Sequence, residues 1–265
     1  MQRPRVLITR PGSRAQPLRR AMEERGAEVE SVEAMRLVAL PESQASRQAW
    51  LDFDLFQRVV VVSPFAAECL AEGLDRYWPQ LPVGPAFYAV GAGTAQVLNE
   101  RLGVRVRLPE PGAGEDTSEA LLRLASLQRL EEQRLLLVAG EGGRALLAET
   151  LAQRGARLTR LALYRRERVA PSGRALQCLR EGDFCALVVT SGELLEHLAG
   201  WCSEKALNQP LIVSSQRLAT LAHTLGYMRP IVAQGATPAA LAVAVANVCN
   251  LDGADHDDLK RASDR

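Results

Sequence analysis

The stretch that decides the fold is Ala186-Leu187-Val188-Val189-Thr190-Ser191-Gly192-Glu193-Leu194. Its first four residues are all apolar, which is typical of a strand buried on both faces in a parallel sheet. Thr190 or Ser191 is then expected to cap the helix that follows, which leaves backbone N–H groups free above the end of the sheet. The run Val59-Val60-Val61-Val62-Ser63-Pro64-Phe65 has the same plan. Two such turns predict a pair of helix ends that accept anions.

The composition is that of a globular protein without a strong charge bias. The chain has 265 residues, of which 47% are hydrophobic and 24% charged, and its formal net charge is +1. This balance gives no reason to expect nucleic acid or a membrane surface as a partner. Neither an apolar leader nor a run of about 20 apolar residues is present, so we expect a cytoplasmic protein. The five cysteines lack C-x-x-C spacing and are expected to be reduced, mostly buried thiols.

Strand-like and helix-like segments alternate along the chain. The expected strands are Val6–Thr9, Val29–Val32, Met35–Leu40, Arg58–Val62, Ala86–Val90, Val104–Leu108, Leu135–Ala139, Leu158–Leu163, Ala186–Val189, Leu211–Ser214 and Ile231–Ala233. The expected helices include Arg14–Arg25, Ser46–Leu51, Pro64–Gly73, Thr94–Leu102, Ser118–Leu127, Ala145–Arg154, Gln216–Leu225 and Pro238–Val248. This alternation predicts parallel sheets with helices on both faces. The charged segment 251–265 is expected to be disordered.

A weak internal repeat divides the chain into two related halves. Arg25-Gly26-Ala27 and Arg154-Gly155-Ala156 lie 129 residues apart (154 − 25), each between a helix and a strand. Ser63 and Ser191 lie 128 apart (191 − 63). The repeat alone places a boundary near Leu130. The extended, proline-ended stretches 35–41 and 165–171 instead suggest two hinge strands, by which the chain leaves one domain and returns to it. The residues leave both divisions open.

Chemistry is expected at the turns that follow the strands. These turns are Thr9-Arg10-Pro11-Gly12, Ser63-Pro64, Gly91-Ala92-Gly93-Thr94, Gly140–Arg144, Thr190-Ser191-Gly192 and Ser214-Ser215-Gln216. Because ligands bind beyond the carboxyl ends of strands in open parallel sheets, the turns predict a cleft rich in backbone N–H and hydroxyl donors. Such a cleft suits a ligand with many carboxylates. Tyr164 ends a strand that leads into the second hinge stretch, and its hydroxyl is expected to reach the cleft.

Two other functions remain open from the residues alone. Gly140-Glu141-Gly142-Gly143-Arg144-Ala145 fits the G-x-G-x-x-A fingerprint of dinucleotide sites, and Arg165 and Arg166 would suit the 2′-phosphate of NADP in a reductase. Paired domains would also suit a small-molecule binding protein of the periplasmic type. The three histidines show no metal-ligand spacing, and Ser63 and Ser191 lack a base in their local sequence. Metal chemistry and covalent nucleophilic catalysis are therefore not expected.

In their order and spacing these motifs resemble the uroporphyrinogen-III synthase family over about residues 5–248. The resemblance rests on Val6-Leu7-Ile8-Thr9-Arg10-Pro11, Val62-Ser63-Pro64, the V-G-x-x-T-A turn at Val90–Ala95, Gly140–Arg144 with Gly155 and Tyr164-Arg165, and Thr190-Ser191-Gly192. One motif departs from the family pattern, because Val213-Ser214-Ser215-Gln216-Arg217-Leu218-Ala219 lacks the threonine of a second G-x-x-T-A turn. Ser214 or Ser215 is expected to supply the missing hydroxyl.

The resemblance implies an α/β fold of two similar flavodoxin-like parallel-sheet domains joined by a two-strand hinge. One domain would comprise residues 1–36 and 168–250, and the other 37–167. It also implies a hydro-lyase of heme and other tetrapyrrole synthesis that needs no cofactor. Hydroxymethylbilane, a linear tetrapyrrole with eight carboxylates, would lose water and close to uroporphyrinogen III with its terminal ring inverted. Unassisted closure gives the uninverted isomer, so the enzyme would direct the reaction as well as accelerate it.

The turns and the resemblance together name the expected site. Tyr164 is the candidate that protonates or hydrogen-bonds the leaving hydroxyl. The candidates for substrate binding are Arg10, Arg14, Ser63, Gly91, Thr94, Arg144, Thr190, Ser191, Gly192, Ser214 and Ser215. No metal or cofactor is expected. The protein would be a monomer, with hydroxymethylbilane as its small-molecule partner. A transient contact with the preceding enzyme of the pathway is compatible with this.

Overall fold

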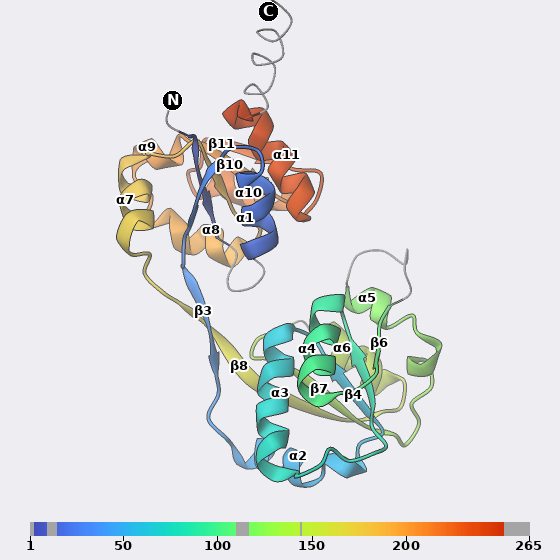
Figure 1. The fold of residues 1–265 in the computed structure, drawn as a ribbon. Coiled ribbons are helices and arrows are strands. Elements are labelled where there is room, and N and C mark those ends of the chain that lie inside the picture. The colour runs from blue at the N-terminus through green and yellow to red at the C-terminus, as the bar shows by residue number, and fades with distance from the viewer. Residues whose placement is uncertain (1–2, 10–14, 110–116, 144, 252–265) are drawn as a thin grey trace, which may run out of the picture. The chain divides into compact units, whose positions relative to one another are not determined.

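The computed structural model describes residues 3–9, 15–109, 117–143 and 145–251. Strands and helices alternate through these ranges (Figure 1). Contacts between residues divide the chain into two units. Unit 1 comprises Met1–Arg36 and Arg168–Arg265, and unit 2 comprises Leu37–Glu167. One β-sheet belongs to each unit.

The sheet of unit 1 has the order β11-β10-β9-β1-β2, and its neighbouring strands are parallel. Its strands are β1 (Arg5–Ile8), β2 (Glu28–Ser31), β9 (Ala186–Val188), β10 (Pro210–Val213) and β11 (Arg229–Val232). Its helices are α1 (Ala15–Glu23), α7 (Gly173–Glu181), α8 (Gly192–Ala199), α9 (Glu204–Leu207), α10 (Gln216–Thr224) and α11 (Pro238–Cys249). Numbered within the unit, the strands lie in the flavodoxin-like order 2-1-3-4-5.

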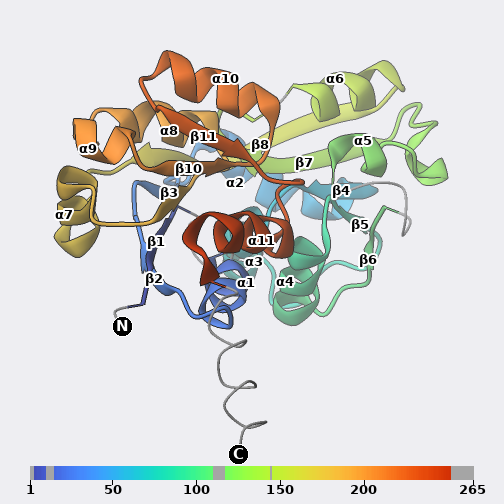
Figure 2. The same cartoon turned by 90° about the horizontal axis from the view of Figure 1, so that it is seen from above.

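Helices cover both faces of this sheet. Val6 and Ile8 of β1 pack into a core with α1 and α11, whereas Leu7 between them packs into a core with α7, α8 and α10. Successive residues of a strand point to opposite faces, so an unbroken apolar run fills both cores. Within unit 1, Figure 2 shows α1 and α11 on one side of the strands and α8 and α10 on the other.

The sheet of unit 2 has the order β3-β8-β7-β4-β5-β6, and its pairs from β8 to β6 are parallel. Its strands are β3 (Met35–Ala39), β4 (Arg58–Val61), β5 (Ala86–Ala89), β6 (Val106–Arg107), β7 (Arg134–Gly140) and β8 (Arg157–Arg168). Its helices are α2 (Gln44–Leu51), α3 (Pro64–Tyr77), α4 (Ala92–Leu102), α5 (Ser118–Leu121) and α6 (Leu146–Gln153), with 3-10 turns at Phe53–Leu55 and Ala125–Leu127.

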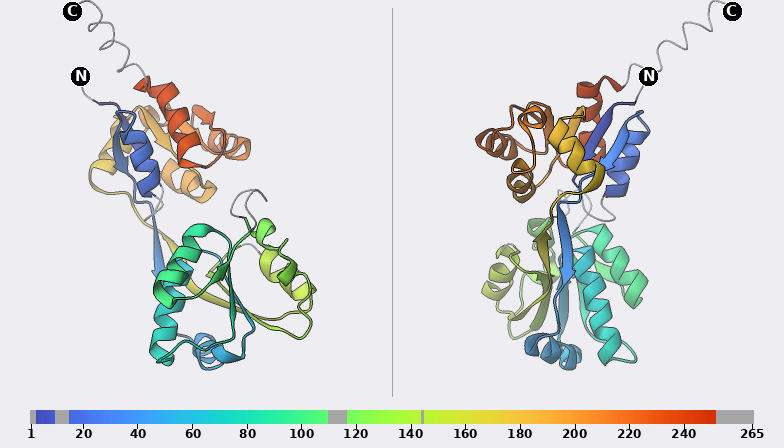
Figure 3. Two further views of the ribbon diagram at one scale, coloured as in Figure 1. Left: turned by 45° about the vertical axis from the view of Figure 1, so that its right-hand side comes forward. Right: turned by 90° about the vertical axis from the view of Figure 1, so that its left-hand side faces the viewer.

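The layers of unit 2 repeat those of unit 1. Val59 and Val61 pack with α2, α3 and α4, and Val60 packs with α5 and α6 on the opposite face. The right-hand view of Figure 3 shows this layering within unit 2. The predicted fold class, an α/β protein with two similar parallel-sheet domains, is therefore confirmed.

The internal repeat runs across both units. Gly26 and Gly155 each follow a helix and have a left-handed backbone, with φ of 86° and 91°. The N–H of Gly26 donates to the carbonyl oxygen of Glu23, and that of Gly155 to the carbonyl oxygen of Ala152, both at 2.9 Å. Thus β7-α6-β8 of unit 2 repeats β1-α1-β2 of unit 1, and β4, β5 and β6 occupy the sheet positions that β9, β10 and β11 hold in unit 1. Each unit combines the first two strands of one half with the last three of the other. We call this arrangement the interleaved repeat.

One expected helix was wrong, and two helices were not expected. The segment 118–127 is not one helix, because α5 ends at Leu121 and a 3-10 turn follows. The side chain of Arg154 donates from Nη1 to the carbonyl oxygens of Leu122 (2.7 Å) and Leu127 (2.9 Å) and so replaces helical N–H donors. Helices α7 and α9 were not among the expected elements. Only Ala175, Cys178 and Leu179 of α7 are buried, which leaves a weak apolar pattern.

The expected tail begins one residue too early. Leu251 is only 7% exposed and belongs to the core that β1 shares with α1 and α11. It follows Asn250, whose left-handed conformation (φ 51°) ends α11 and turns the chain back toward the core. Residues 252–265 lie outside the described residues.

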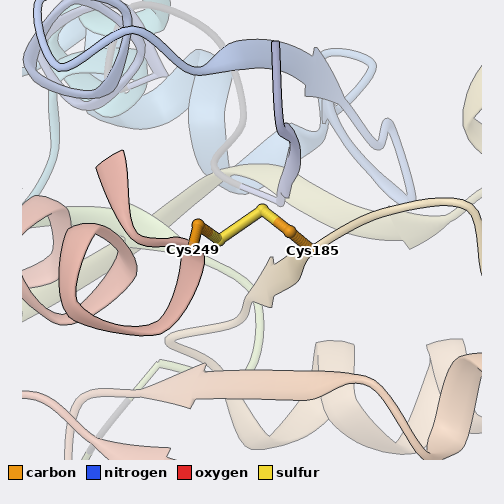
Figure 4. Close-up of a disulfide and its surroundings, with 2 residues drawn as sticks. All are labelled: Cys185 and Cys249. Atoms are coloured by element: carbon orange, nitrogen blue, oxygen red, sulfur yellow. A yellow bond between two sulfur atoms is a disulfide. The ribbon is translucent and has the colours of Figure 1, made fainter. Parts of the chain in front are cut away.

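The expectation that the cysteines are reduced was wrong for one pair. Cys185, just before β9, forms a disulfide with Cys249 at the end of α11 (Figure 4). Cys69 and Cys178 are free and buried, and Cys202 is free and half-buried. Burial raises the pKa of the Cys69 and Cys202 thiols to about 11. The pair is 64 residues apart in sequence, and only the fold brings α11 to the start of β9.

Candidate active site

One edge of the unit 2 sheet gathers residues from four neighbouring strands. Ser63 follows β4, Gly91 follows β5, and Gly140 ends β7. Tyr164 of β8 lies opposite Gly140, after a register shift between Ala139 and Gly140. Because β8, β7, β4 and β5 are adjacent and parallel, these positions lie along one edge. Together with Thr94 in the first turn of α4, they form what we call the unit 2 rim.

Ser63 joins the start of α3 to Tyr164. Its backbone is extended (φ −155°, ψ 157°), and its Oγ accepts the backbone N–H of Ala66 at 3.2 Å, as the predicted cap requires. The same Oγ lies 3.1 Å from the phenol oxygen of Tyr164, and either oxygen can donate. The structure therefore brings together two candidates that stand 101 residues apart in the sequence.

The ring of Tyr164 is held on two further sides. A Cβ built on Gly140 would lie 2.6 Å from Cζ of Tyr164, so the hydroxyl end of the ring rests directly on this glycine. Phe65 meets the ring edge to face, with centroids 5.3 Å apart and planes at 90°. The backbone of Tyr164 is fixed as well, because its carbonyl oxygen accepts the N–H of Glu141 at 2.8 Å.

At the next strand end the helix cap has no side chain. Gly91 occupies the cap position of α4 (φ −147°, ψ 165°), and its carbonyl oxygen accepts the N–H groups of Thr94 (3.1 Å) and Ala95 (3.2 Å). Thr94 is buried. A glycine cap leaves the first backbone N–H groups of a helix accessible to an anion, since no side chain covers them.

The carboxyl ends of β9 and β10 form a similar edge in unit 1. We call Thr190, Ser191, Gly192, Ser214 and Ser215 the unit 1 rim. Of the two candidates for the cap of α8, Ser191 takes the position, but within the described residues its side chain makes no cap hydrogen bond. Ser215 caps α10 and accepts the N–H of Leu218 at 3.4 Å. The predicted Ser63 cap is confirmed, whereas Ser191 holds only the backbone geometry of a cap.

Three predicted arginines cannot be placed. Arg10, Arg14 and Arg144 lie outside the described residues, so their role stays a prediction. One arginine beside the unit 2 rim was not predicted: Nη2 of Arg160 lies 3.9 Å from where a Cβ on Gly143 would stand, next to the Gly140–Gly143 turn. Its position in the middle of β8 gave no sign of this, because pairing with β7 brings it there.

A further helix cap was also missed. Thr237 caps α11 after β11, and its side chain accepts the N–H of Ala240 at 3.2 Å. The dipeptide Thr237-Pro238 is of the same kind as Ser63-Pro64, with a hydroxyl cap followed by proline at the first helical position. That likeness was available in the sequence and could have added this turn to the set.

His197 has a packing role. It lies in α8, donates from Nε2 to the carbonyl oxygen of Val169 at 2.8 Å and stacks edge to face with Trp201. Within the described residues there is no group of three or more His, Cys, Asp or Glu that could hold a metal ion. In the same residues no helix is long and apolar enough to cross a membrane.

The fold and the two rims define a class of protein, namely a two-unit α/β protein whose strand ends carry hydroxyl and backbone N–H donors. The family model described as "Uroporphyrinogen-III synthase HemD" matches residues 5–242. The chain belongs to this family, whose members are enzymes of porphyrin biosynthesis.

Named relatives agree with this assignment. Uroporphyrinogen-III synthase of Salmonella typhimurium is 35% identical over 247 residues, which cover 89% of this chain and 97% of that protein. The Escherichia coli uroporphyrinogen-III synthase is 37% identical over 174 residues, or 63% of this chain and 68% of that protein.

Solved structures share the fold. Uroporphyrinogen-III synthetase of Helicobacter pylori has a TM-score of 0.57 at 14% identity and covers 93% of this chain and 100% of its own. A mutant uroporphyrinogen III synthase of Thermus thermophilus has a TM-score of 0.52 at 18% identity, over 93% and 98% of the two chains.

The two other functions left open by the residues are not favoured. The family match and the named relatives favour a synthase over an NADP-dependent reductase. The same findings favour it over a small-molecule binding protein of the periplasmic type.

Proposed function

We propose that this chain converts hydroxymethylbilane into uroporphyrinogen III, with loss of water and inversion of the terminal ring, as a hydro-lyase. The observation that carries the proposal is the family match over residues 5–242. The alignment with the Salmonella relative, which covers 97% of that protein, supports it. The reaction needs an enzyme that holds a flexible polyanion in one conformation, because unassisted closure gives the uninverted isomer. Donor-rich strand ends are suited to that task.

The rims supply binding without a large positive charge. We propose that backbone N–H groups and hydroxyls of Ser63, Gly91, Thr94, Thr190, Ser191, Gly192, Ser214 and Ser215 bind substrate carboxylates, together with Arg10, Arg14 and Arg144. Helix N-termini carry about half a positive charge each, which favours anions there. Arg160 adds a full charge beside the Gly140–Gly143 turn.

Tyr164 is the proposed proton donor. When the hydroxymethyl C–O bond breaks, both electrons of the bond stay with the oxygen, and a proton from the phenol lets it leave as water. The ring left behind is a resonance-stabilised cation, and the substituted α-carbon of the terminal ring bonds to its methylene carbon. The bond from that α-carbon to its original methylene bridge then breaks, which leaves a second stabilised cation at the bridge carbon. This carbon bonds to the unsubstituted α-carbon of the terminal ring, whose proton is lost and restores the phenol, so that the ring is inverted. Ser63 supports this role, because its hydroxyl lies 3.1 Å from the phenol oxygen and can donate to the oxygen as its proton departs.

The activity itself is tested with freshly generated hydroxymethylbilane. The purified protein is mixed with the bilane, the products are oxidised to porphyrins, and the isomers are separated by chromatography. We expect the inverted isomer to dominate, whereas buffer alone gives the uninverted isomer. A product mixture equal to that of buffer would rule out the proposed reaction. Equal turnover with and without added NADPH is expected, and reduction of any substrate at the expense of NADPH would favour a reductase instead.

The role of Tyr164 is tested by Tyr164→Phe, which removes only the hydroxyl. General acid catalysis contributes about 10²–10⁴-fold, so we expect kcat to fall by about 10²-fold or more while KM changes little. Tyr77→Phe is the matched control, because Tyr77 lies in the last turn of α3 and its hydroxyl donates to Glu42 rather than to the rim. An unchanged rate in Tyr164→Phe would remove Tyr164 from the mechanism.

A further inference from the structure

At Gly140 the absence of a side chain is required by another rim residue, Tyr164. A Cβ on Gly140 would stand 2.6 Å from Cζ, 2.7 Å from Cε2 and 3.0 Å from Cε1 of Tyr164. Carbon atoms that are not bonded approach to about 3.5–4.0 Å, so the two groups cannot both keep their places. The three atoms are those nearest the hydroxyl, which means that the conflict falls on the reactive end of the ring.

The side chain, not the backbone, would yield. Gly140 is paired with Tyr164 in the sheet, and the Glu141 N–H to Tyr164 O hydrogen bond of 2.8 Å ties the two strands together at this point. The ring of Tyr164, by contrast, is half-buried and can turn about its side-chain torsions. A shift of about 1 Å at the ring would follow. That shift is enough to break the 3.1 Å contact between the phenol oxygen and Ser63 Oγ.

Phe65 restrains the same ring from another direction. Its edge-to-face contact with Tyr164, at 5.3 Å between centroids, comes from the first turn of α3, whose start is fixed by the Ser63 cap. Ser63 and Phe65 therefore reach the ring from one rigid turn, and Gly140 reaches it from the end of β7. The position of the phenol oxygen is set by three contacts from two elements.

We propose that Gly140 and Phe65 are positioning residues, which hold the hydroxyl of Tyr164 at Ser63 and so at the leaving hydroxyl of the substrate. This inference rests on the proposed function of Tyr164 as the proton donor. A glycine turn suggests phosphate or carboxylate binding. The role proposed for Gly140 is different, because this residue supports the ring of Tyr164. A misplacement of about 1 Å in a catalytic group costs up to about 10²-fold in rate.

The test is Gly140→Ala. We expect kcat to fall by about 10- to 100-fold, with KM within about twofold of wild type. The share of uninverted product should rise as unassisted closure competes. Gly200→Ala is the control outside both rims, because Gly200 has φ −70° and a Cβ there would lie 3.9 Å from its nearest described neighbour, the carbonyl oxygen of His197. This control should keep wild-type kcat.

A double variant separates positioning from general damage. If Gly140 acts through the Tyr164 hydroxyl, Gly140→Ala/Tyr164→Phe should be no slower than Tyr164→Phe alone. Losses that multiply would show that Gly140→Ala disturbs the rim by another route and would overturn the proposal. Should Gly140→Ala fail to fold, Phe65→Leu tests the second restraint, with an expected several-fold loss of kcat, and wild-type kcat there would overturn the proposal instead.

The outcomes distinguish this inference from the function beneath it. If the wild-type protein makes no inverted isomer, the proposed function fails and the positioning role fails with it. If Tyr164→Phe keeps full activity, the proton-donor role fails and Gly140 has nothing to position. If Tyr164→Phe is slow but Gly140→Ala is as fast as wild type, the positioning proposal alone is overturned.

Discussion

At the scale of single residues, close packing reverses the usual preference between glycine and alanine. Gly73 lies inside α3, where glycine costs up to about 1 kcal/mol relative to alanine. Trp50 of α2 lies over it so closely that a Cβ would stand 2.6 Å from Cζ2. Trp50 is only 2% exposed, so its ring has nowhere to move. The clash therefore outweighs the helix preference.

We expect Gly73→Ala to lower the free energy of unfolding by about 1–2 kcal/mol, because overpacking a core costs about 1–3 kcal/mol and the better helix former returns part of it. Urea unfolding measures the change. Gly93→Ala in the first turn of α4 is the control, since its Cβ would make an ordinary 3.7 Å contact with Pro64 and should leave stability equal or slightly higher. A stabilised Gly73→Ala would show that Trp50 repacks freely.

The candidate site could be predicted as a set of residues but not as a set of contacts. Ser63 and Tyr164 were each chosen for a local reason, a cap and a strand end. The strand end was wrong for Tyr164, because β8 continues to Arg168. Their 3.1 Å contact depends on β4 and β8 lying on either side of β7, which no local pattern reveals. The support that Gly140 and Phe65 give to Tyr164 is hidden for the same reason. For Ser191 the local prediction held for the position but not for the contact. Ser191 occupies the cap position of α8, yet its side chain makes no cap hydrogen bond among the described residues.

At the scale of elements, buried strands were the easiest to predict and short polar helices the hardest. The apolar runs at β1, β4, β7, β9 and β10 fill a core on both faces and therefore stand out in sequence. Helix α7 buries only three residues, and its boundary signals are the cap position of Ser172 and the left-handed Gly182 (φ 71°). Just after α5 ends, Arg154, distant in sequence, donates to the carbonyl oxygen of Leu122.

The cap of the last helix gives a prediction at this scale. Thr237→Ala removes the hydroxyl that accepts the Ala240 N–H and should lower the free energy of unfolding by about 1 kcal/mol. Thr220→Ala is the control, because this exposed threonine lies inside α10, where alanine is the better helix former. Thr220→Ala should be neutral or slightly stabilising. Equal losses in the two variants would show that the Thr237 hydroxyl does not act as a cap.

At the scale of the whole molecule, the alternation of apolar strands and helices was sufficient to predict two parallel-sheet α/β domains. The disulfide could not be predicted in this way. Composition argued for free thiols, and the pairing of Cys185 with Cys249 arises only because α11 packs along the sheet that contains β9. The covalent link closes a loop of 64 residues within unit 1.

We expect the disulfide to contribute about 2–4 kcal/mol to the stability of unit 1. Cys249→Ser should lose that amount in urea unfolding without reductant, and should match the wild type once dithiothreitol is present. Cys202→Ser is the control, since Cys202 forms no disulfide and its variant should respond to reductant as the wild type does. Alkylation and mass measurement, with and without prior reduction, give an independent count of the bonded cysteines. If Cys185 and Cys249 are alkylated in native protein without reductant, the bond is absent in solution.

The interleaved repeat also sets the order in which a newly made chain can assemble. β1 pairs with β2 at once, but its other neighbour is β9, and Val6 must meet Ala186. At translation rates of about 5–20 residues per second, roughly ten seconds or more pass before that partner leaves the ribosome. The inserted unit is complete by then. The first strand to be synthesised is thus among the last to gain both of its neighbours. Throughout this interval the free edge of β1 in the β1-α1-β2 segment is exposed to chaperones or to other nascent chains.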